Sequence, residues 1–204
     1  MAPAAAAGRR ETAHRAASQA ASDVALVSRI AAGDPLAMQV LFARHNVRVF
    51  RFVMGIVKDR TLADDIIGDV FLDVWRHAGR FEERASVSTW LLAIARYKAL
   101  DGNRRGRAHV HVDIDEALAI ADTSDDPETA AQTRDRDEVL RNCIAQLSPS
   151  HREILDLVYY QEMTIEAVAE IIGAPLNTVK TRMFYARKHI AAMLQEAGLD
   201  RAAL

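Results

Sequence analysis

The sequence of 204 residues has a single cysteine, Cys143, and no apolar stretch long enough to cross a membrane. One cysteine excludes an intramolecular disulfide and suits a reducing compartment, so we expect a cytoplasmic protein without membrane insertion. Aromatic residues make up only 6% of the chain, which also has just 9 glycines and 5 prolines. Because half of the residues are apolar while turn-forming residues are scarce, the composition predicts an all-α protein.

The chain also lacks an excess of either charge, since its formal net charge is −2. The charges are nevertheless sorted by region. Residues 113 to 128 include seven acids and no base, whereas residues 173 to 189 include no acid. This sorting predicts separate surfaces for partners of opposite charge.

Catalytic and metal-binding patterns are lacking as well. There is no glycine-rich phosphate-binding loop, and Cys143 has no neighbouring general base. The segment "HVHVD" places His109, His111 and Asp113 at alternating positions, as metal ligands on a strand would be, but no second cluster completes a site. We therefore expect no enzymatic activity, no cofactor and no metal.

Helical periodicity divides the rest of the chain into two small domains. An Ala-rich tail, 1–21, is expected to be disordered, and 108–133 is expected to be a flexible acidic linker. The first domain, 22–107, is predicted to hold helices at 23–32, 35–57, 61–78 and 86–105, with Asp23 and Thr61 starting the first and third. The second domain, 134–204, is predicted to hold helices at 134–146 and 149–161, followed by a helical pair. In 35–57, the helical period is kept by Leu36, Val40, Leu41, Val47, Phe50, Met54 and Val57.

The last two helices form a helix-turn-helix pattern. Thr164 can cap the first helix, Gly173 can end it, and Pro175 suits the entry to the second. In the second helix, Val179 and Met183 recur on an apolar face, while the opposite face is polar and basic. Such a helix is expected to enter the DNA major groove. The alternative is an αα-hairpin with a solvated basic face.

The third predicted helix carries an acidic face. Asp65, Asp69 and Asp73 stack at i, i+4 spacing with Asp64 beside them, although like charges at that spacing are unfavourable. Docking to a basic protein surface accounts for this face, and so does simple solvation. The buried stripe of this helix is expected to be Ile66, Ile67, Val70, Phe71, Val74 and Trp75.

The fourth predicted helix is basic. The loop before it holds Phe81 and leads to Trp90. Its cations are Arg96, Lys98, Arg104, Arg105 and Arg107. Single-stranded nucleic acid is bound in this way, because cations follow the phosphates while flat apolar groups receive unstacked bases. Core packing of Phe81, Trp90 and Tyr97 is the alternative.

Taken in order, these segments resemble a bacterial RNA polymerase sigma factor of the extracytoplasmic-function type, in the sigma-70 family. The resemblance covers 22–107 and 134–195 and rests on "DRTLADDIIGDVFLDVWRHAGRF", "STWLLAIARYKALDGNRR" and "LSPSHREILDLVYYQEMTIEAVAEIIGAPLNTVKTRMFYARKHI". It implies that the first domain resembles region 2, which binds core RNA polymerase and opens the minus-ten element of promoter DNA. It implies that the second resembles region 4, which contacts the minus-thirty-five duplex. A stress or envelope regulon and an anti-sigma factor are also implied.

The resemblance further implies roles for individual residues. Core polymerase contacts are expected at Asp64, Asp65, Asp69 and Phe71. Minus-ten contacts are expected at Phe81, Arg96, Lys98, Arg104 and Arg105. At the minus-thirty-five element, base contacts are expected from Lys180, Thr181, Phe184 and Tyr185, and the surrounding contacts from Asn177, Thr178, Arg182, Arg187 and Lys188.

The chain departs from the family pattern at three positions. Asn177 stands where glycine is common, Tyr97 near a usual asparagine, and Tyr185 near a usual basic residue. Tyrosine cannot make the bidentate guanine contact of arginine, so the usual minus-thirty-five sequence is not assumed. Two other protein classes fit part of the pattern: a stand-alone dimeric helix-turn-helix regulator on a palindromic operator, and a helical adaptor.

Overall fold

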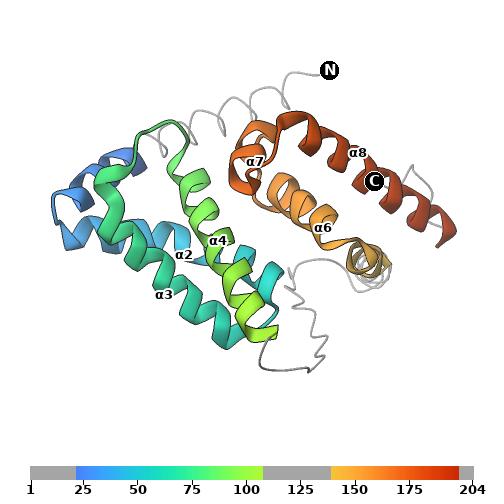
Figure 1. The fold of residues 1–204 in the computed structure, drawn as a ribbon, viewed down its shortest axis with the longest axis horizontal. Coiled ribbons are helices and arrows are strands. Elements are labelled where there is room, and N and C mark those ends of the chain that lie inside the picture. The colour runs from blue at the N-terminus through green and yellow to red at the C-terminus, as the bar shows by residue number, and fades with distance from the viewer. Residues whose placement is uncertain (1–21, 108–138, 198–204) are drawn as a thin grey trace, which may run out of the picture. The chain divides into compact units, whose positions relative to one another are not determined.

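The structure is a computed structural model that describes residues 22–107 and 139–197 (Figure 1). Every regular element within these ranges is helical, which confirms the all-α class. The helices form two compact units, each with its own packed interior. The expected tail at 1–21, the expected linker at 108–133 and the "HVHVD" segment lie outside the described residues.

The first unit is built on three long helices that each pack against the other two (Figure 1). They are α2 (Pro35–Val57), α3 (Arg60–His77) and α4 (Val87–Arg107), preceded by a helical segment at 22–31. A short 3₁₀ turn, η1 (Ala78–Arg80), follows α3. The core between the helices includes Leu41, Phe52, Val70, Val74, Leu91 and Leu92, all almost fully buried.

Side-chain caps fix where these helices begin. The Asp34 carboxylate accepts from the backbone N–H groups of Leu36 and Ala37 at 2.9 and 3.2 Å, just before α2. Asp59 caps α3 by accepting from the Leu62 N–H at 3.1 Å, so this helix begins at Arg60 and the predicted start at Thr61 was wrong. Of the two serines that could start the predicted helix 86–105, Ser86 and Ser88, it is Ser86 that accepts from the Thr89 N–H at 3.1 Å and opens α4.

Helix α2 has two apolar stripes, and the one that packs inward contains a histidine. The buried residues are Ala37, Leu41, His45, Val49, Phe52 and Val53. By contrast Leu36, Val40 and Val47, which keep the helical period in the sequence, are exposed. Hydropathy could not choose between the stripes, because the inward one depends on a partner that satisfies His45.

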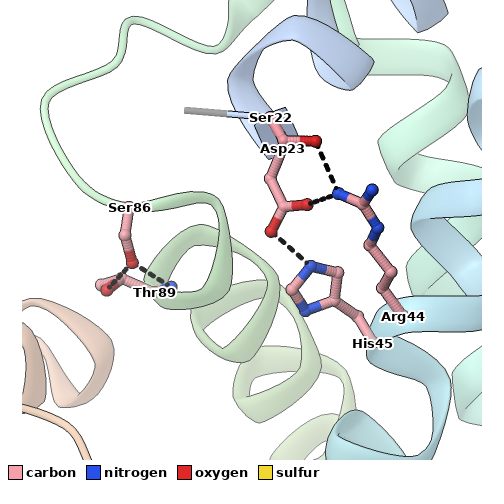
Figure 2. A network of polar contacts seen from close by, with 6 residues as sticks. All are labelled: Ser22, Asp23, Arg44, His45, Ser86 and Thr89. Carbon is pink, nitrogen blue, oxygen red and sulfur yellow. Dashed lines mark hydrogen bonds and ion pairs between the residues drawn. The ribbon is translucent and has the colours of Figure 1, made fainter. Parts of the chain in front are cut away.

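That partner is Asp23, which is itself buried (Figure 2). Asp23 Oδ1 accepts from Arg44 Nη1 at 2.7 Å, and its Oδ2 lies 2.9 Å from His45 Nε2. Burial lowers the pKa of His45, and the hydrogen bond and charge of Asp23 oppose that shift. Asp23 therefore lies within its helix and not at the expected helix start. Its contacts with Arg44 and His45 hold the segment 22–31 against α2.

A glycine lets the basic end of α4 approach α3 closely. A Cβ at Gly102 would lie 3.2 Å from Ile66 Cδ1, tighter than ordinary van der Waals contact. Beside it, the Asn103 side-chain amide donates to the Ile56 carbonyl at 3.3 Å. The residues that follow on α4, Arg104 and Arg105, therefore start from a fixed backbone.

The second unit consists of a helical segment at 139–146, α6 (Pro149–Leu155), η2 (Asp156–Tyr160), α7 (Ile165–Ile172) and α8 (Leu176–Glu196). Thr164 Oγ1 accepts from the Ala167 N–H at 3.2 Å, and Gly173 follows α7 at φ +64°, as the helix-turn-helix pattern predicts. The predicted helix at 149–161 is not a single α-helix, because η2 is a π-helical turn. Turns of this kind often mark functional sites.

Candidate functional site

Helix α8 has a buried face and an exposed polar face, as its sequence predicts. Val179, Met183 and Ala186 are buried. The candidate DNA-contacting residues lie on the other side or at its edges. Exposed among them are Asn177, Lys180, Thr181, Phe184, Tyr185, Arg187 and Lys188, whereas Thr178 and Arg182 are half-buried. The four residues expected to contact bases, Lys180, Thr181, Phe184 and Tyr185, are all exposed, and their contacts with a duplex stay a prediction.

The aromatic and basic side chains of α8 are held by ring contacts. Phe184 and Tyr185 meet edge to face with ring centroids 5.5 Å apart. The Arg187 guanidinium lies 5.7 Å from the centroid of Tyr159, which belongs to the π-helical turn η2. An exposed cation–π contact is worth about 0.5–1 kcal/mol, enough to orient Arg187 while leaving it able to exchange partners.

The turn η2 also carries a buried carboxyl. Desolvation raises the pKa of Asp156 to about 6, opposed by a weak hydrogen bond from Gln161 at 3.5 Å. The partly buried His151 lies edge-on to His189, with ring centroids 5.5 Å apart. Burial, followed by the charges of His189 and Arg182, lowers the pKa of His151.

The outer face of α3 combines acids with apolar groups. Asp64, Asp65 and Asp69 are exposed, and Leu72 and Trp75 are 43% and 39% exposed. The prediction that Trp75 is buried was wrong, because its position on the helix turns it towards the face of Asp64 and Leu72. We call Asp64, Asp65, Asp69, Leu72 and Trp75 the α3 outer face.

Phe71, the fourth candidate for the polymerase contact, lies in the core. Its side chain is 5% exposed, and its ring meets that of Phe42 at a centroid distance of 4.8 Å. Phe42 on α2 is 40% exposed. Phe71 therefore supports a neighbouring surface ring by packing, and its role in a direct contact stays a prediction.

The acidic and basic helices are joined by an ion pair. Asp73 of α3 and Lys98 of α4 meet at 2.7 Å, and both side chains are largely shielded from solvent, being 34% and 20% exposed. Sequence reasoning placed Asp73 and Lys98 on separate surfaces. Their pairing depends on how α3 packs against α4, and no local pattern reports it.

A second acid pairs with the basic end of α4. Asp101 Oδ1 contacts Arg104 Nη2 at 2.5 Å, and Asp101 Oδ2 contacts Arg105 Nη2 at 2.7 Å. The i, i+3 and i, i+4 spacings make both pairs visible in the sequence. Neither pair was predicted from the sequence.

The loop before α4 places an aromatic pair next to these charges. The rings of Phe81 and Trp90 lie 5.0 Å apart at an interplanar angle of 37°, and both residues are half-buried. Tyr97 is 75% exposed, which rules out the core packing considered for it. Flat apolar surface is thus available near the start and the middle of α4.

The part of the chain that the structure describes offers no group of three or more His, Cys, Asp or Glu side chains placed to hold a metal. Among the same residues, no helix combines the length and apolarity that a membrane span needs.

Two family models match the chain. One, described as Sigma-70 region 2, matches residues 41–109, and the other, Sigma-70, region 4, matches residues 137–190. Together they span more than half of the chain. The first contains α3 and α4, and the second contains α7 and most of α8.

Similar proteins agree with these matches. ECF RNA polymerase sigma factor SigL of Mycobacterium tuberculosis is 28% identical over 180 residues, which is 87% of this chain and all of that protein. ECF RNA polymerase sigma factor SigK of Mycobacterium bovis is 29% identical over 167 residues, covering 78% of this chain and 86% of that protein.

Two solved structures share the fold at a TM-score of 0.61. CnrH in complex with the cytosolic domain of CnrY is 22% identical and covers 85% of this chain and 97% of that one. The sigma factor RpoE in complex with the anti-sigma factor NepR, from Bartonella quintana, is 20% identical and covers 77% and 96%. From both domain matches, in order, and from relatives matched over most of their length, the chain belongs to the sigma-70 family of RNA polymerase sigma factors, in its extracytoplasmic-function type.

Proposed function

We propose that this chain binds core RNA polymerase and directs it to specific promoters, with each of its three charged helices meeting a different partner. The observation that carries the proposal is the separation of charge. Acids are exposed on α3, while the exposed face of α8 carries cations and, from its start through His189, no acid. A single molecule with both surfaces can hold a basic protein and a nucleic acid at the same time.

The α3 outer face is the proposed polymerase contact. Asp64, Asp65 and Asp69 supply charge, and Leu72 and Trp75 supply apolar area. Stable protein interfaces combine a desolvated apolar centre with a polar rim, and tryptophan is common among the residues that dominate their energy. Solvation alone accounts for exposed acids but gives no reason for an exposed tryptophan among them.

Helix α4 and the loop before it form the proposed minus-ten surface. Phe81 and Trp90 offer flat apolar surface to an unstacked base, and Arg96, Lys98, Arg104 and Arg105 are the cations proposed to follow the strand. Tyr97, on the same helix, is exposed enough to receive a second base.

Helix α8 is the proposed minus-thirty-five surface. Lys180, Thr181, Phe184 and Tyr185 are exposed and are proposed to face base edges. Arg187, which lies against Tyr159, and Lys188 are proposed to bind phosphates beside them, and Asn177, Thr178 and Arg182 to fix the helix on the duplex.

An anti-sigma factor is the proposed regulator, and a stress or envelope response the proposed setting. Both CnrH and RpoE, which share this fold, were solved with a bound protein, and for RpoE that protein is named as an anti-sigma factor. The apolar side chains exposed on α2, Leu36, Val40 and Val47, give such a partner an accessible surface.

The test is transcription by core RNA polymerase with and without the purified chain, on DNA that contains its own promoter. We expect promoter-specific initiation only when the chain is present. A chain that ignores the core enzyme and binds a palindromic operator as a dimer would be the stand-alone regulator instead. A chain that binds neither would be a helical adaptor.

A further inference from the structure

We propose that Asp101 is an internal competitor of the promoter strand. In the free protein its carboxylate occupies Arg104 and Arg105, and phosphates must displace it before the two arginines can bind DNA. This inference rests on the proposed function, because it concerns the same α4 surface.

Both carboxylate oxygens of Asp101 form ion pairs. Each oxygen of Asp101 contacts a different guanidinium, at 2.5 Å for Arg104 and 2.7 Å for Arg105. The Asp101 side chain is only 21% exposed, whereas those of Arg104 and Arg105 are 81% and 80% exposed. The acid therefore lies against the helix, and the two guanidiniums extend outward around it. A phosphate would offer the same arginines the same kind of anionic oxygens.

Lys98, which precedes Asp101 on α4, is also paired with an acid, in this case one on α3. Its partner is Asp73, at 2.7 Å, so Lys98, Arg104 and Arg105 each contact an acid of the same unit. Helix α8 differs, because no ion pair is found for any of its cations within the described ranges. Of the two helices proposed to bind DNA, α4 is thus the one whose cations are paired with acids in the part of the chain that the structure describes.

The strength of the pairing suits a competitor. Both guanidiniums are solvent-exposed, and ion pairs screened by water are weak, so DNA phosphates can compete with Asp101 for Arg104 and Arg105. The bound carboxylate still cancels part of the positive charge that would draw any strand to the free protein. Removing it should raise affinity for single-stranded DNA without regard to sequence.

A purely structural role predicts a different result. Asp101 could support the helix through its i, i+3 and i, i+4 pairs, or it could hold the two arginines ready for the strand. In the first case its loss would not strengthen DNA binding, and in the second its loss would weaken binding. The direction of the change therefore separates competition from support and from positioning.

The experiment measures the affinity of the full chain for a short fluorescent single-stranded oligonucleotide of unrelated sequence, across about 50 to 200 mM salt. Four variants are compared with the parent chain. Two are single changes, Asp101→Asn and Asp101→Glu. The third is the double variant Arg104→Ala, Arg105→Ala, and the fourth adds Asp101→Asn to that double variant. Glu196→Gln is the control, because it changes the net charge by the same amount at an exposed site on another helix. Circular dichroism checks that each variant is folded.

We expect Asp101→Asn to bind about 3–10 times more tightly at the lowest salt and to lose affinity more steeply with salt, by up to about 0.7 in log–log slope per phosphate gained. Asp101→Glu, which keeps the anion, and Glu196→Gln should stay within about twofold of the parent. In the Arg104→Ala, Arg105→Ala background, Asp101→Asn should have no effect, because nothing remains to release.

Unchanged or weaker binding by Asp101→Asn, together with weaker binding by the double-alanine variant, would overturn the competitor role alone. Unchanged binding by the double-alanine variant would overturn more, because α4 would then not be the strand-binding surface of the proposed function.

Discussion

The two units of this molecule carry their charges in different ways. In the first unit acids and bases lie within contact distance of one another, as Asp73 does with Lys98 and Asp101 with Arg105, at 2.7 Å in both cases. In the second unit, the exposed face of α8 displays Lys180, Arg187 and Lys188, and residues 173 to 189 include no acid.

This difference indicates what each unit can bind. A surface with one sign of charge is ready for a duplex, because each cation can displace a counterion from the phosphates at once. A unit that mixes signs can face a protein through its acids and a nucleic acid through its bases. Its own ion pairs, however, compete with both partners. The first unit is thus suited to act once polymerase has brought a strand to it, and the second to search for duplex sites.

The largest effect should come from reversing the charge of exposed acids on the α3 outer face. Asp65→Lys with Asp69→Lys should reduce affinity for core polymerase by more than about 100-fold, because attraction to a basic partner becomes repulsion. Fluorescence anisotropy with purified core enzyme measures this. Glu162→Lys with Glu196→Lys makes the same change in net charge at exposed residues of the second unit and should bind normally. Equal losses for both pairs would mean that total charge, and not the α3 outer face, decides binding.

The next largest effect should come from the exposed face of α8. Lys180→Ala with Thr181→Ala should lower use of the chain's own promoter by about 10- to 100-fold, since a good base contact is worth about 1–3 kcal/mol. Affinity for core polymerase should not change. Single-round transcription measures promoter use, with Gln195→Ala on the same helix as control. If core affinity fell in parallel, the units would not divide the work as proposed.

A smaller effect should separate phosphate contacts from base contacts on α8. Lys188→Ala should weaken binding of the polymerase complex to all duplexes alike and reduce the log–log salt slope by about 1. Filter binding at several salt concentrations, on the promoter and on a scrambled duplex, tests this. A loss confined to the promoter would make Lys188 a specificity residue instead.

The smallest effect concerns Asp156, a carboxyl group of the second unit whose pKa is markedly raised. Burial raises the pKa of Asp156 to about 6, above its ordinary 3.8. Its protonated form therefore favours folding below about pH 4, and that contribution is lost as pH rises through about 6.

Asp156→Asn should consequently increase the free energy of unfolding by about 2 kcal/mol at pH 8, and by much less at about pH 4. Urea denaturation followed by circular dichroism measures both values. A gain of the same size at both pH values would show that the charge of Asp156 is not the cause.

Much of the fold follows from local signals. The cap at Thr164 and the left-handed Gly173 follow their sequence patterns, since each depends on a few neighbouring residues. The inward face of α2 could not be chosen, because its polar member His45 is satisfied by Asp23, 22 residues away. The prediction that Trp75 is buried was wrong for a related reason. An apolar residue at the edge of an apolar stripe can pack into the core or face a partner.

The candidate site divides in the same way. The exposed positions of α8 follow from helical period alone, and the structure agrees with them. The pair of Asp73 and Lys98 needs the packing of α3 on α4, which no pattern within either helix specifies. The pairs of Asp101 were within reach of sequence reasoning, because their spacing is local.

The most direct test of the whole account is site-specific photocrosslinking in the complex of polymerase, chain and promoter. A photoreactive phenylalanine derivative would replace Leu72 on the α3 outer face or Phe184 on α8, which are 43% and 63% exposed. The account predicts that position 72 crosslinks to a polymerase subunit and position 184 to duplex DNA of the minus-thirty-five element. Crosslinks from both positions to the same partner, or from position 72 to DNA, would contradict it.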